Sequence, residues 1–208
     1  MSNQKTLVRY GAADRMNHWL VALCFILAGI SGLSLFHPSM YFLSGVLGGG
    51  EWTRILHPFI GVVMAVLFLR MIFKFTRHNM LTANDRQWLS QVGDVLNARH
   101  DKLPEVGRYN GGQKVAFWLM VVSLILLTVS GFGFWRPYFS HYFSVDVNRV
   151  AALVHALSAW VLILTVIVHV YAAIWVKGTI GAMRTGLVSH AWARKHHPGW
   201  YKEMTGGK

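Results

Sequence analysis

The stretch VAALVHALSAWVLILTVIVHVYAAIWV, residues 150–176, is an almost unbroken apolar segment that contains two histidines, His155 and His169. As a helix rising about 1.5 Å per residue it would be roughly 40 Å long, enough to cross a bilayer. At about 100° per residue the two histidines share one face, about 21 Å apart along the axis. Ionisable side chains at membrane depth face a bundle interior and pair there. The segment therefore predicts a transmembrane helix that needs two partners.

Three further apolar runs, residues 19–36, 55–73 and 115–135, are long enough to span a membrane once flanking turns are added. The chain has 208 residues, 54% of them hydrophobic and 13% charged. We predict an all-α integral membrane four-helix bundle forming one domain over residues 1–208. The expected spans cover about 15–37, 53–76, 113–135 and 149–177.

The formal net charge of +12 does not indicate nucleic-acid binding, because the basic residues flank the apolar runs instead of forming one basic domain. Lys and Arg concentrate in the N-terminal segment, in residues 74–114 and after residue 177. The positive-inside bias then places both termini in the cytoplasm, together with a loop over 77–112 and a soluble tail over 178–208.

The cytoplasmic loop contains a pattern typical of a short amphipathic helix at the membrane surface. Asn84 or Asp85 is the expected cap, and the helical spacing continues through Trp88, Val92, Val95, Leu96 and Arg99. On the opposite side, the connection over residues 36–52 carries Pro38 and three consecutive glycines, which predict turns. The glycine-rich residues 107–113 are interpreted, from the residues alone, as a flexible hinge.

Four histidines fall in or at the ends of the spans, and the alternating direction of the helices pairs them by depth. His57 meets His155 near the outer surface, and His18 meets His169 near the cytoplasmic surface. Two facing imidazoles can hold a haem iron from both sides within an apolar core. A zinc site would need three or four converging ligands, and neither level has a nearby carboxylate or cysteine. The pattern thus predicts two b-type haems that transfer single electrons.

The other histidines lie in loops or tails and are interpreted as solvated: His37, His78, His100, His141, His190, His196 and His197. Small residues near the ligands leave room for a flat ring between helices. Arg54 and Arg70 are candidates for contact with haem propionates, and snorkelling side chains explain them equally well.

Several motifs are distributed along the whole chain. They are Arg9, Asp14-Arg15, His18-Trp19, Ile55-Leu56-His57-Pro58-Phe59, Gly107-Arg108-Tyr109-Asn110, Gly112-Gln113-Lys114, Trp135-Arg136-Pro137-Tyr138-Phe139, Trp175-Val176-Lys177-Gly178 and Lys195-His196-His197-Pro198-x-Trp200-Tyr201. Together these motifs closely resemble the cytochrome b556 (gamma) subunit of bacterial respiratory formate dehydrogenases of the N and O types. The resemblance covers essentially the whole chain, and a shorter tail leans towards the O type.

The resemblance implies a multi-pass subunit of the bacterial inner membrane that serves anaerobic respiration. A molybdopterin catalytic (alpha) subunit would oxidise formate outside the membrane, and an iron–sulfur (beta) subunit would deliver the electrons to the outer haem. The inner haem would pass them to menaquinone beside His169, with Asn110 acting through water and Gly112 and Gln113 in the wall of the site. Proton uptake from the cytoplasm would complete a redox loop, and the heterotrimers would associate further.

Two other functions are compatible with the histidine pattern. The cytochrome b subunit of a hydrogenase or similar oxidoreductase would keep the histidines and serve another electron donor. A channel or transporter would use them to relay protons or ions, and it would carry no pigment.

Overall fold

A computed structural model describes residues 6–97, 99 and 103–206. It groups the chain into two compact units, each described here by itself. The bundle unit consists of residues 16–73 and 119–167, and the tail unit consists of the described residues of 1–15, 74–118 and 168–208. The sequence predicts a single membrane domain, and that description stays a prediction.

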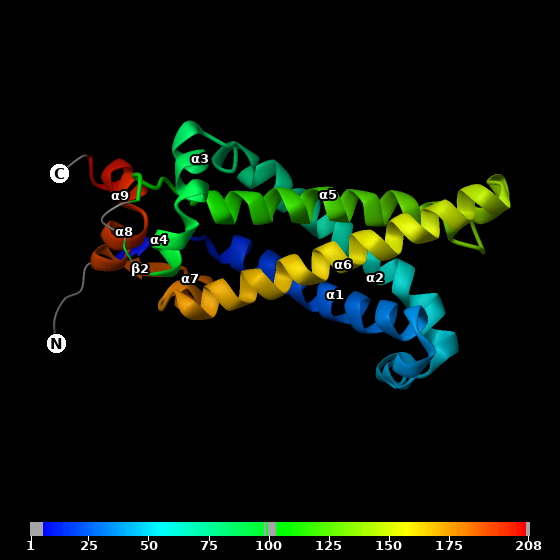
Figure 1. Ribbon diagram of the computed structural model, residues 1–208. Coiled ribbons are helices and arrows are strands. Elements are labelled where there is room, and N and C mark those ends of the chain that lie inside the picture. The colour runs from blue at the N-terminus through cyan, green and yellow to red at the C-terminus, as the bar shows by residue number, and fades with distance from the viewer. Residues whose placement is uncertain (1–5, 98, 100–102, 207–208) are drawn as a thin grey trace. The chain divides into compact units, whose positions relative to one another are not determined.

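Four long helices dominate the structure: α1 (Ala12–Phe36), α2 (Gly50–Phe75), α5 (Gly111–Phe134) and α6 (Val145–Trp175) (Figure 1). By length and composition, each is able to cross a membrane. The expected all-α fold with four candidate membrane spans is therefore confirmed. Pro58 lies inside α2, and because proline has no N–H, the carbonyl of Arg54 loses its partner within the helix.

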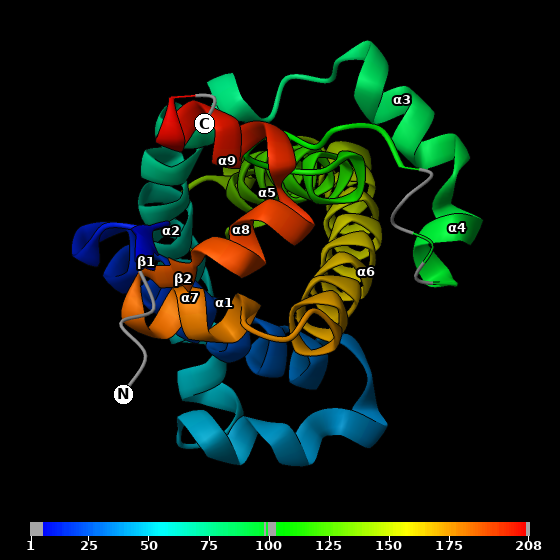
Figure 2. The ribbon, with the colours of Figure 1, turned by 90° about the vertical axis from the view of Figure 1, so that its left-hand side faces the viewer.

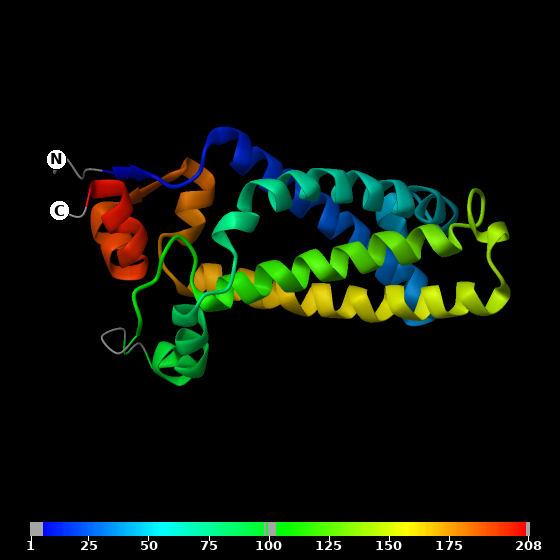
Figure 3. The ribbon, with the colours of Figure 1, turned by 90° about the horizontal axis from the view of Figure 1, so that it is seen from above.

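The four long helices run alongside one another (Figure 3) but bury little of their surface. Of the most apolar 18-residue window in each, 11–22% is buried inside the chain. Among the described residues, close backbone approach is concentrated in the short elements of the tail unit. Most of the apolar surface of these helices is thus left for lipid, a cofactor or other subunits. One cross-link within the bundle unit is polar: buried Asn17 of α1 donates from Nδ2 to the Leu67 carbonyl of α2, 3.0 Å away.

The connection between α1 and α2, expected to consist of turns, contains a 3-10 helix, η1 (Pro38–Leu47). Gly48 and Gly49 then adopt φ values of 88° and 103°, a left-handed region that favours glycine. A shorter 3-10 helix, η4 (Ser140–Tyr142), lies between α5 and α6, and another, η2 (Thr76–His78), follows α2.

The loop predicted to hold one amphipathic helix holds two, α3 (Ala83–Ser90) and α4 (Val92–Leu96). The predicted cap is wrong, because Thr82 is the N-cap and Asp85 closes a capping box by accepting from its backbone N–H at 2.8 Å. Asp85 also accepts from the Thr82 hydroxyl at 2.7 Å and forms an ion pair with Lys114 at the start of α5, 2.6 Å long and largely buried. These bonds fix α3 to the first turn of α5.

The tail is a folded assembly of short elements (Figure 2). Strands β1 (Thr6–Val8) and β2 (Leu187–Ser189) pair antiparallel, with Leu7 opposite Val188. Helices α7 (Thr179–Thr185) and α8 (His190–His196) contact β2, and α9 (Pro198–Thr205) packs on α8. The small core consists of Ala182, Val188, Ala193 and Trp200.

Candidate functional site

The bundle unit brings together two of the four predicted ligands. His57 of α2 and His155 of α6 lie with their ring centroids 6.2 Å apart and their planes at 68° to each other. Two histidines 98 positions apart in the sequence are therefore neighbours in space.

His57 is held by a serine of α1. Its Nδ1 lies 2.8 Å from Oγ of Ser31, a side chain that is 1% exposed. The single hydroxyl proton of Ser31 is shared between the carbonyls of Leu27, 2.7 Å away, and Ala28, 3.1 Å away. Nδ1–H of His57 therefore donates to the serine oxygen, which leaves the lone pair on Nε2.

His155 is held in the same manner by α5. Its Nδ1 lies 3.0 Å from the Leu127 carbonyl and 3.2 Å from Oγ of Ser130. A carbonyl oxygen only accepts, so Nδ1 of His155 carries the proton. The Ser130 hydroxyl points to the Leu126 carbonyl at 2.5 Å. These hydrogen bonds use Nδ1 of each histidine, which leaves the two Nε2 atoms as candidate ligands.

Two glycines let these rings lie directly against the neighbouring helices. A Cβ added to Gly32 of α1 would lie 3.3 Å from Cε1 of His57. A Cβ added to Gly131 of α5 would lie 3.3 Å from Cε1 of His155. The dipeptide Ser-Gly thus occurs once beside each histidine, at residues 31–32 and 130–131.

The donor set fits a haem iron. A bond from a metal to an imidazole nitrogen is about 2 Å long, and the ring centroid lies roughly 1 Å further back, so two imidazoles on opposite sides of one iron have centroids about 6 Å apart. The observed 6.2 Å agrees with this value. Within the described part of the chain, no group of three or more His, Cys, Asp or Glu side chains could hold a bare metal ion.

The other predicted pair, His18 and His169, is divided between the two units. His18 belongs to the bundle unit, where its ring makes an edge contact with Trp19, with centroids 5.3 Å apart. His169 belongs to the tail unit, near the end of α6. Their pairing stays a prediction.

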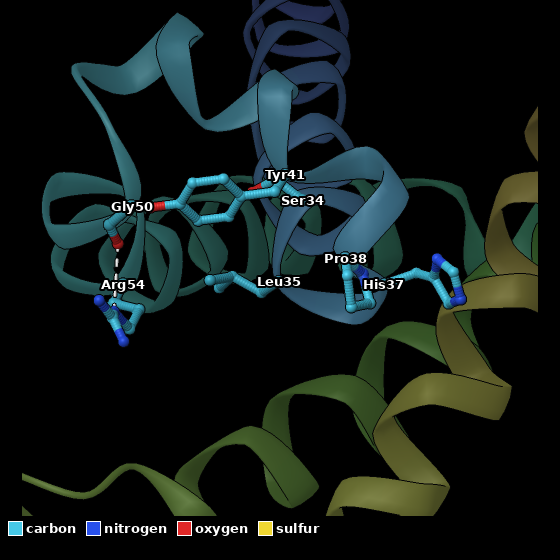
Figure 4. Close-up of a pocket in the computed structure, with 7 residues that line it drawn as sticks. All are labelled: Ser34, Leu35, His37, Pro38, Tyr41, Gly50 and Arg54. Atoms are coloured by element: carbon cyan, nitrogen blue, oxygen red, sulfur yellow. Dashed lines mark hydrogen bonds between the residues drawn. The ribbon is translucent and has the colours of Figure 1, made fainter.

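A pocket of about 490 Å³ lies between the end of α1, η1 and the start of α2 (Figure 4). Arg54 lines it and donates from Nε to the Gly50 carbonyl at 3.2 Å, and the hydroxyl of Tyr41 points towards Gly50. Helical spacing places Arg54 one turn from His57 along α2. Contact of Arg54 with a haem propionate remains a prediction, as does any such role of Arg70.

Asn110 and Gln113, both predicted at a quinone site, form the N-terminal cap of α5. Oδ1 of Asn110 accepts from the backbone N–H of Gln113 at 2.9 Å, and Oε1 of Gln113 accepts from that of Asn110 at 3.0 Å. This reciprocal arrangement is a capping box. The side-chain oxygens are therefore used by the fold, whereas neither amide nitrogen donates to a described residue.

The glycines that follow Asn110 serve close packing. A Cβ on Gly111 would lie 2.8 Å from the Asp85 carbonyl, and one on Gly112 would lie 3.1 Å from the Trp88 ring of α3. Gly111 and Gly112 are thus packed against α3, and the interpretation of residues 107–113 as a flexible hinge stays a prediction. A role of Gly112 in a quinone site stays a prediction.

Three consecutive carbonyls ahead of Asn110 are each held by a distant part of the tail unit. Gly199 N–H donates to the Val106 carbonyl at 3.0 Å. Nδ1 of His197 donates to the Gly107 carbonyl, also at 3.0 Å. A guanidinium nitrogen, Nη2 of Arg9, donates to the Arg108 carbonyl. Arg108 in turn donates from Nη2 to the Arg9 carbonyl at 2.6 Å. We call the six residues that make these bonds the loop clamp: Arg9, Val106, Gly107, Arg108, His197 and Gly199.

The centre of the loop clamp is buried and cationic. Arg9 is 3% exposed and lies over the Trp200 ring, with its guanidinium carbon 4.3 Å from the ring centroid. Burial lowers the pKa of Arg9. Nη1 of Arg9 and Nε of Arg108 are buried, and no described residue accepts a hydrogen bond from them.

The interpretation of His197 as a solvated histidine is wrong, because it is 3% exposed. Burial and then the nearby charge of Arg9 lower its pKa to about 3. Its Nε2 lies 3.4 Å from Nη2 of Arg9, so the neutral ring accepts from the guanidinium while donating to Gly107. His37 and His141 are exposed, His78, His190 and His196 are partly buried, and His100 lies outside the described residues.

Sequence reasoning missed Ser31, Ser130 and the loop clamp. The repeated Ser-Gly dipeptide, at a similar position in the first and third spans, is the signal that could have indicated the first two. No local signal indicates the loop clamp, because its bonds join residues 90, 99 and 188 positions apart.

Four apolar helices and two neighbouring imidazoles are the features of a b-type membrane cytochrome. The comparisons with known proteins agree with this class. A family model described as prokaryotic cytochrome b561 matches residues 9–186. The chain belongs to this family. The cytochrome b556(fdo) subunit of formate dehydrogenase from Escherichia coli strain K12 is 46% identical over 204 residues, which cover 98% of this chain and 96% of the relative.

Two further relatives carry related names. The nitrate-inducible cytochrome b556(Fdn) subunit of formate dehydrogenase from the same strain is 42% identical, over 98% of this chain and 94% of its own length. The formate dehydrogenase cytochrome b556 subunit of Haemophilus influenzae is 38% identical, over 98% of this chain and 85% of its own length. The resemblance to cytochrome b556 subunits is therefore confirmed.

Proposed function

We propose that this chain is the di-haem cytochrome b membrane subunit of a formate dehydrogenase and that it reduces menaquinone. The observation that carries the proposal is the His57–His155 pair, whose ring centroids lie at a spacing that suits two ligands of one iron and whose hydrogen bonds are made by Nδ1. The names of the relatives support formate dehydrogenase over a hydrogenase as the parent complex. The cytochrome family supports electron transfer over a histidine-relay transporter.

In this proposal the residues hold and orient the cofactors. A haem bound between two histidines would supply one-electron transfer. His57 and His155 would hold the outer haem, while Ser31 and the Leu127 carbonyl keep their Nδ1 atoms protonated. His18 and His169 would hold the inner haem, an assignment that rests on the sequence.

The iron–sulfur (beta) subunit, which receives electrons from the molybdopterin (alpha) subunit, would deliver them at the level of His57 and His155. Menaquinone would accept them at the level of His18 and His169. Formate oxidation itself takes place on the alpha subunit. The complex lies in the bacterial inner membrane with both termini of this chain in the cytoplasm, and its heterotrimers associate further.

Asn110 donates to the quinone in this proposal, with Gln113 beside it. Their side-chain oxygens are occupied in the cap, and the amide N–H groups remain as donors towards a quinone carbonyl or a bridging water. Menaquinone reduction consumes two electrons and two protons, so the acceptor needs water access at the membrane edge. The protons come from the cytoplasm.

The experiment is a formate-reduced minus oxidised spectrum of the purified complex containing His57→Ala, with His141→Ala as the matched control. His141 is an exposed histidine in the connection between α5 and α6. The proposal expects a b-type α-band that formate develops fully in the control and that the His57 variant loses in part, with slow reduction of the remainder. A wild-type complex without a b-type band, or one that formate does not reduce, would contradict the proposal.

A further inference from the structure

The two histidines of the His57–His155 pair are held by bonds of different kinds. The bond from His57 goes to a serine hydroxyl, 2.8 Å away. The shorter of the two contacts of His155 goes to a backbone carbonyl at 3.0 Å, with Ser130 at 3.2 Å as a second acceptor. The Ala28 carbonyl also acts on His57. The partner of His57 at hydrogen-bond geometry is nevertheless the serine, whereas the closest partner of His155 is the backbone, so the two ends differ in which partner is closest.

We propose that Ser31 is the positioning residue that sets the tautomer, orientation and donor strength of His57, and that Ser130 is a secondary support for His155. The proposal rests on the proposed function, because it assumes that the two Nε2 atoms bind iron. It assigns a role to side chains that do not themselves touch the metal.

The geometry of Ser31 makes it an acceptor for His57. Its hydroxyl proton is shared between the carbonyls of Leu27 at 2.7 Å and Ala28 at 3.1 Å. With that proton directed back to its own helix, the oxygen presents a lone pair to Nδ1–H of His57. Ser31 is nearly inaccessible, so water cannot easily replace it.

A hydrogen bond from Nδ1–H to an acceptor makes the opposite nitrogen a stronger donor to a metal. A stronger imidazole donor stabilises the ferric state more than the ferrous state. Ser31 therefore lowers the reduction potential of the outer haem and strengthens its retention. Gly32, with its virtual Cβ at 3.3 Å from the ring, keeps His57 close enough to the helix for this bond.

The test is a potentiometric titration of the purified complex, with the haem-to-chain ratio and the ferric electron paramagnetic resonance spectrum of each variant. In Ser31→Ala we expect one of the two haem components to titrate at a higher potential. The shift should be up to roughly 59 mV, which for one electron is about a tenfold change in the reduction equilibrium constant. The same component should shift its ferric signal and be lost faster to a haem acceptor. Ser31→Thr, which keeps the hydroxyl, should restore all three.

Two further variants act as controls. Ser130→Ala should produce a smaller change, because the Leu127 carbonyl still accepts from His155. Thr128→Val removes a hydroxyl of α5 that bonds the Leu124 carbonyl at 2.7 Å and should change nothing. If Ser31 had only a structural role, Ser31→Ala would lower the stability of the protein without shifting the reduction potential of one haem selectively.

Two haems at wild-type potentials and with wild-type ferric signals in Ser31→Ala would overturn the inference while leaving the proposed function intact. Loss of the outer haem alone would support it. If Ser31→Ala loses both haems, Ser31→Cys decides, since a thiol is a weaker acceptor: a raised potential supports the inference and an unchanged one overturns it. A wild-type complex without haem would instead contradict the proposed function.

Discussion

The His57–His155 pair of the bundle unit and His197 of the tail unit make the same kind of hydrogen bond but have different neighbours. In all three rings Nδ1–H donates to an oxygen of the protein. The difference lies in the neighbour of each ring. Each ring of the pair lies 6.2 Å from another imidazole, centroid to centroid, whereas Nε2 of His197 lies 3.4 Å from a guanidinium nitrogen of Arg9. The neighbour of the ring, and not burial or a fixed tautomer, separates a candidate metal ligand from a structural histidine.

The largest expected effect is a loss of haem when a histidine of the His57–His155 pair is replaced. His57→Ala or His155→Ala should reduce the haem content from two to about one per chain, because an iron held by one imidazole loses an axial bond and its link between α2 and α6. His197→Ala should retain both haems. A pyridine haemochrome assay on purified complex measures the ratio, and two haems in either variant of the pair would refute the assignment.

The next effect concerns the loop clamp. Arg9→Met removes the donor to the Arg108 carbonyl and to His197, which leaves buried acceptors unpaired and should lower the free energy of unfolding by about 2–4 kcal/mol. The matched variant is Lys202→Met, whose ion pair with Glu105 is exposed on both sides and contributes at most about 1 kcal/mol. Denaturation in detergent, followed by tryptophan fluorescence, compares the two. Equal losses would mean that the loop clamp contributes no more than a surface pair.

A smaller and more selective effect is expected at Asn110. Asn110→Asp keeps an oxygen for the capping box and removes the amide N–H, so the fold should be retained while quinone reduction slows by about fivefold, the effect of one hydrogen bond of about 1 kcal/mol. Asn110→Leu should add a capping loss of about 1 kcal/mol in stability. The measurement is steady-state reduction of a quinone analogue at normal haem content. Wild-type rates in Asn110→Asp would leave Asn110 with the capping role alone.

The smallest expected effect is on the stability of the tail unit in acid, and it is absent at neutral pH. The pKa of His197 falls from 6.5 to about 3 on folding, so the unfolded chain binds a proton that the folded chain does not between these values. The stability contributed by neutral His197 is complete above pH 6.5 and declines as the pH falls towards 3. His197→Gln should flatten this part of a stability profile. A profile unchanged by the substitution would assign the acid loss to other groups.

Asp85 contributes to acid sensitivity at lower pH. Burial acts to raise its pKa, but the bonds from Lys114 and Thr82 outweigh burial, and the pKa lies below its ordinary value of 3.8. Its stabilising effect is present above pH 3.8 and is lost as the pH falls through the lowered value. His197 and Asp85 therefore affect stability in different ranges of pH.

The spans and the His57–His155 pair could be predicted because each depends on a strong signal. Apolar length alone indicates a span, and the direction of alternating helices places His57 and His155 at one depth. The bond from His57 to Ser31 could not be predicted in this way, because it depends on how α1 is rotated against α2. A serine in an apolar run has the same appearance whether it faces lipid or a ligand.

The environment of His197 was beyond local patterns for a different reason. A basic segment next to a proline is typical of a solvated tail, and here it is covered by Arg9 and by the backbone at Gly107 from far along the chain. Asn110 is an intermediate case. Its position before a helical run indicates a cap, and the structure adds that the amide nitrogen remains available.

The most direct test of the central assignment is the coordination of iron in the wild-type complex. Electron paramagnetic resonance and near-infrared magnetic circular dichroism of the oxidised protein report the axial ligands of each haem. The account predicts two low-spin haems per chain, each with two imidazole ligands. A high-spin haem, a ligand other than histidine or a single haem per chain would contradict it.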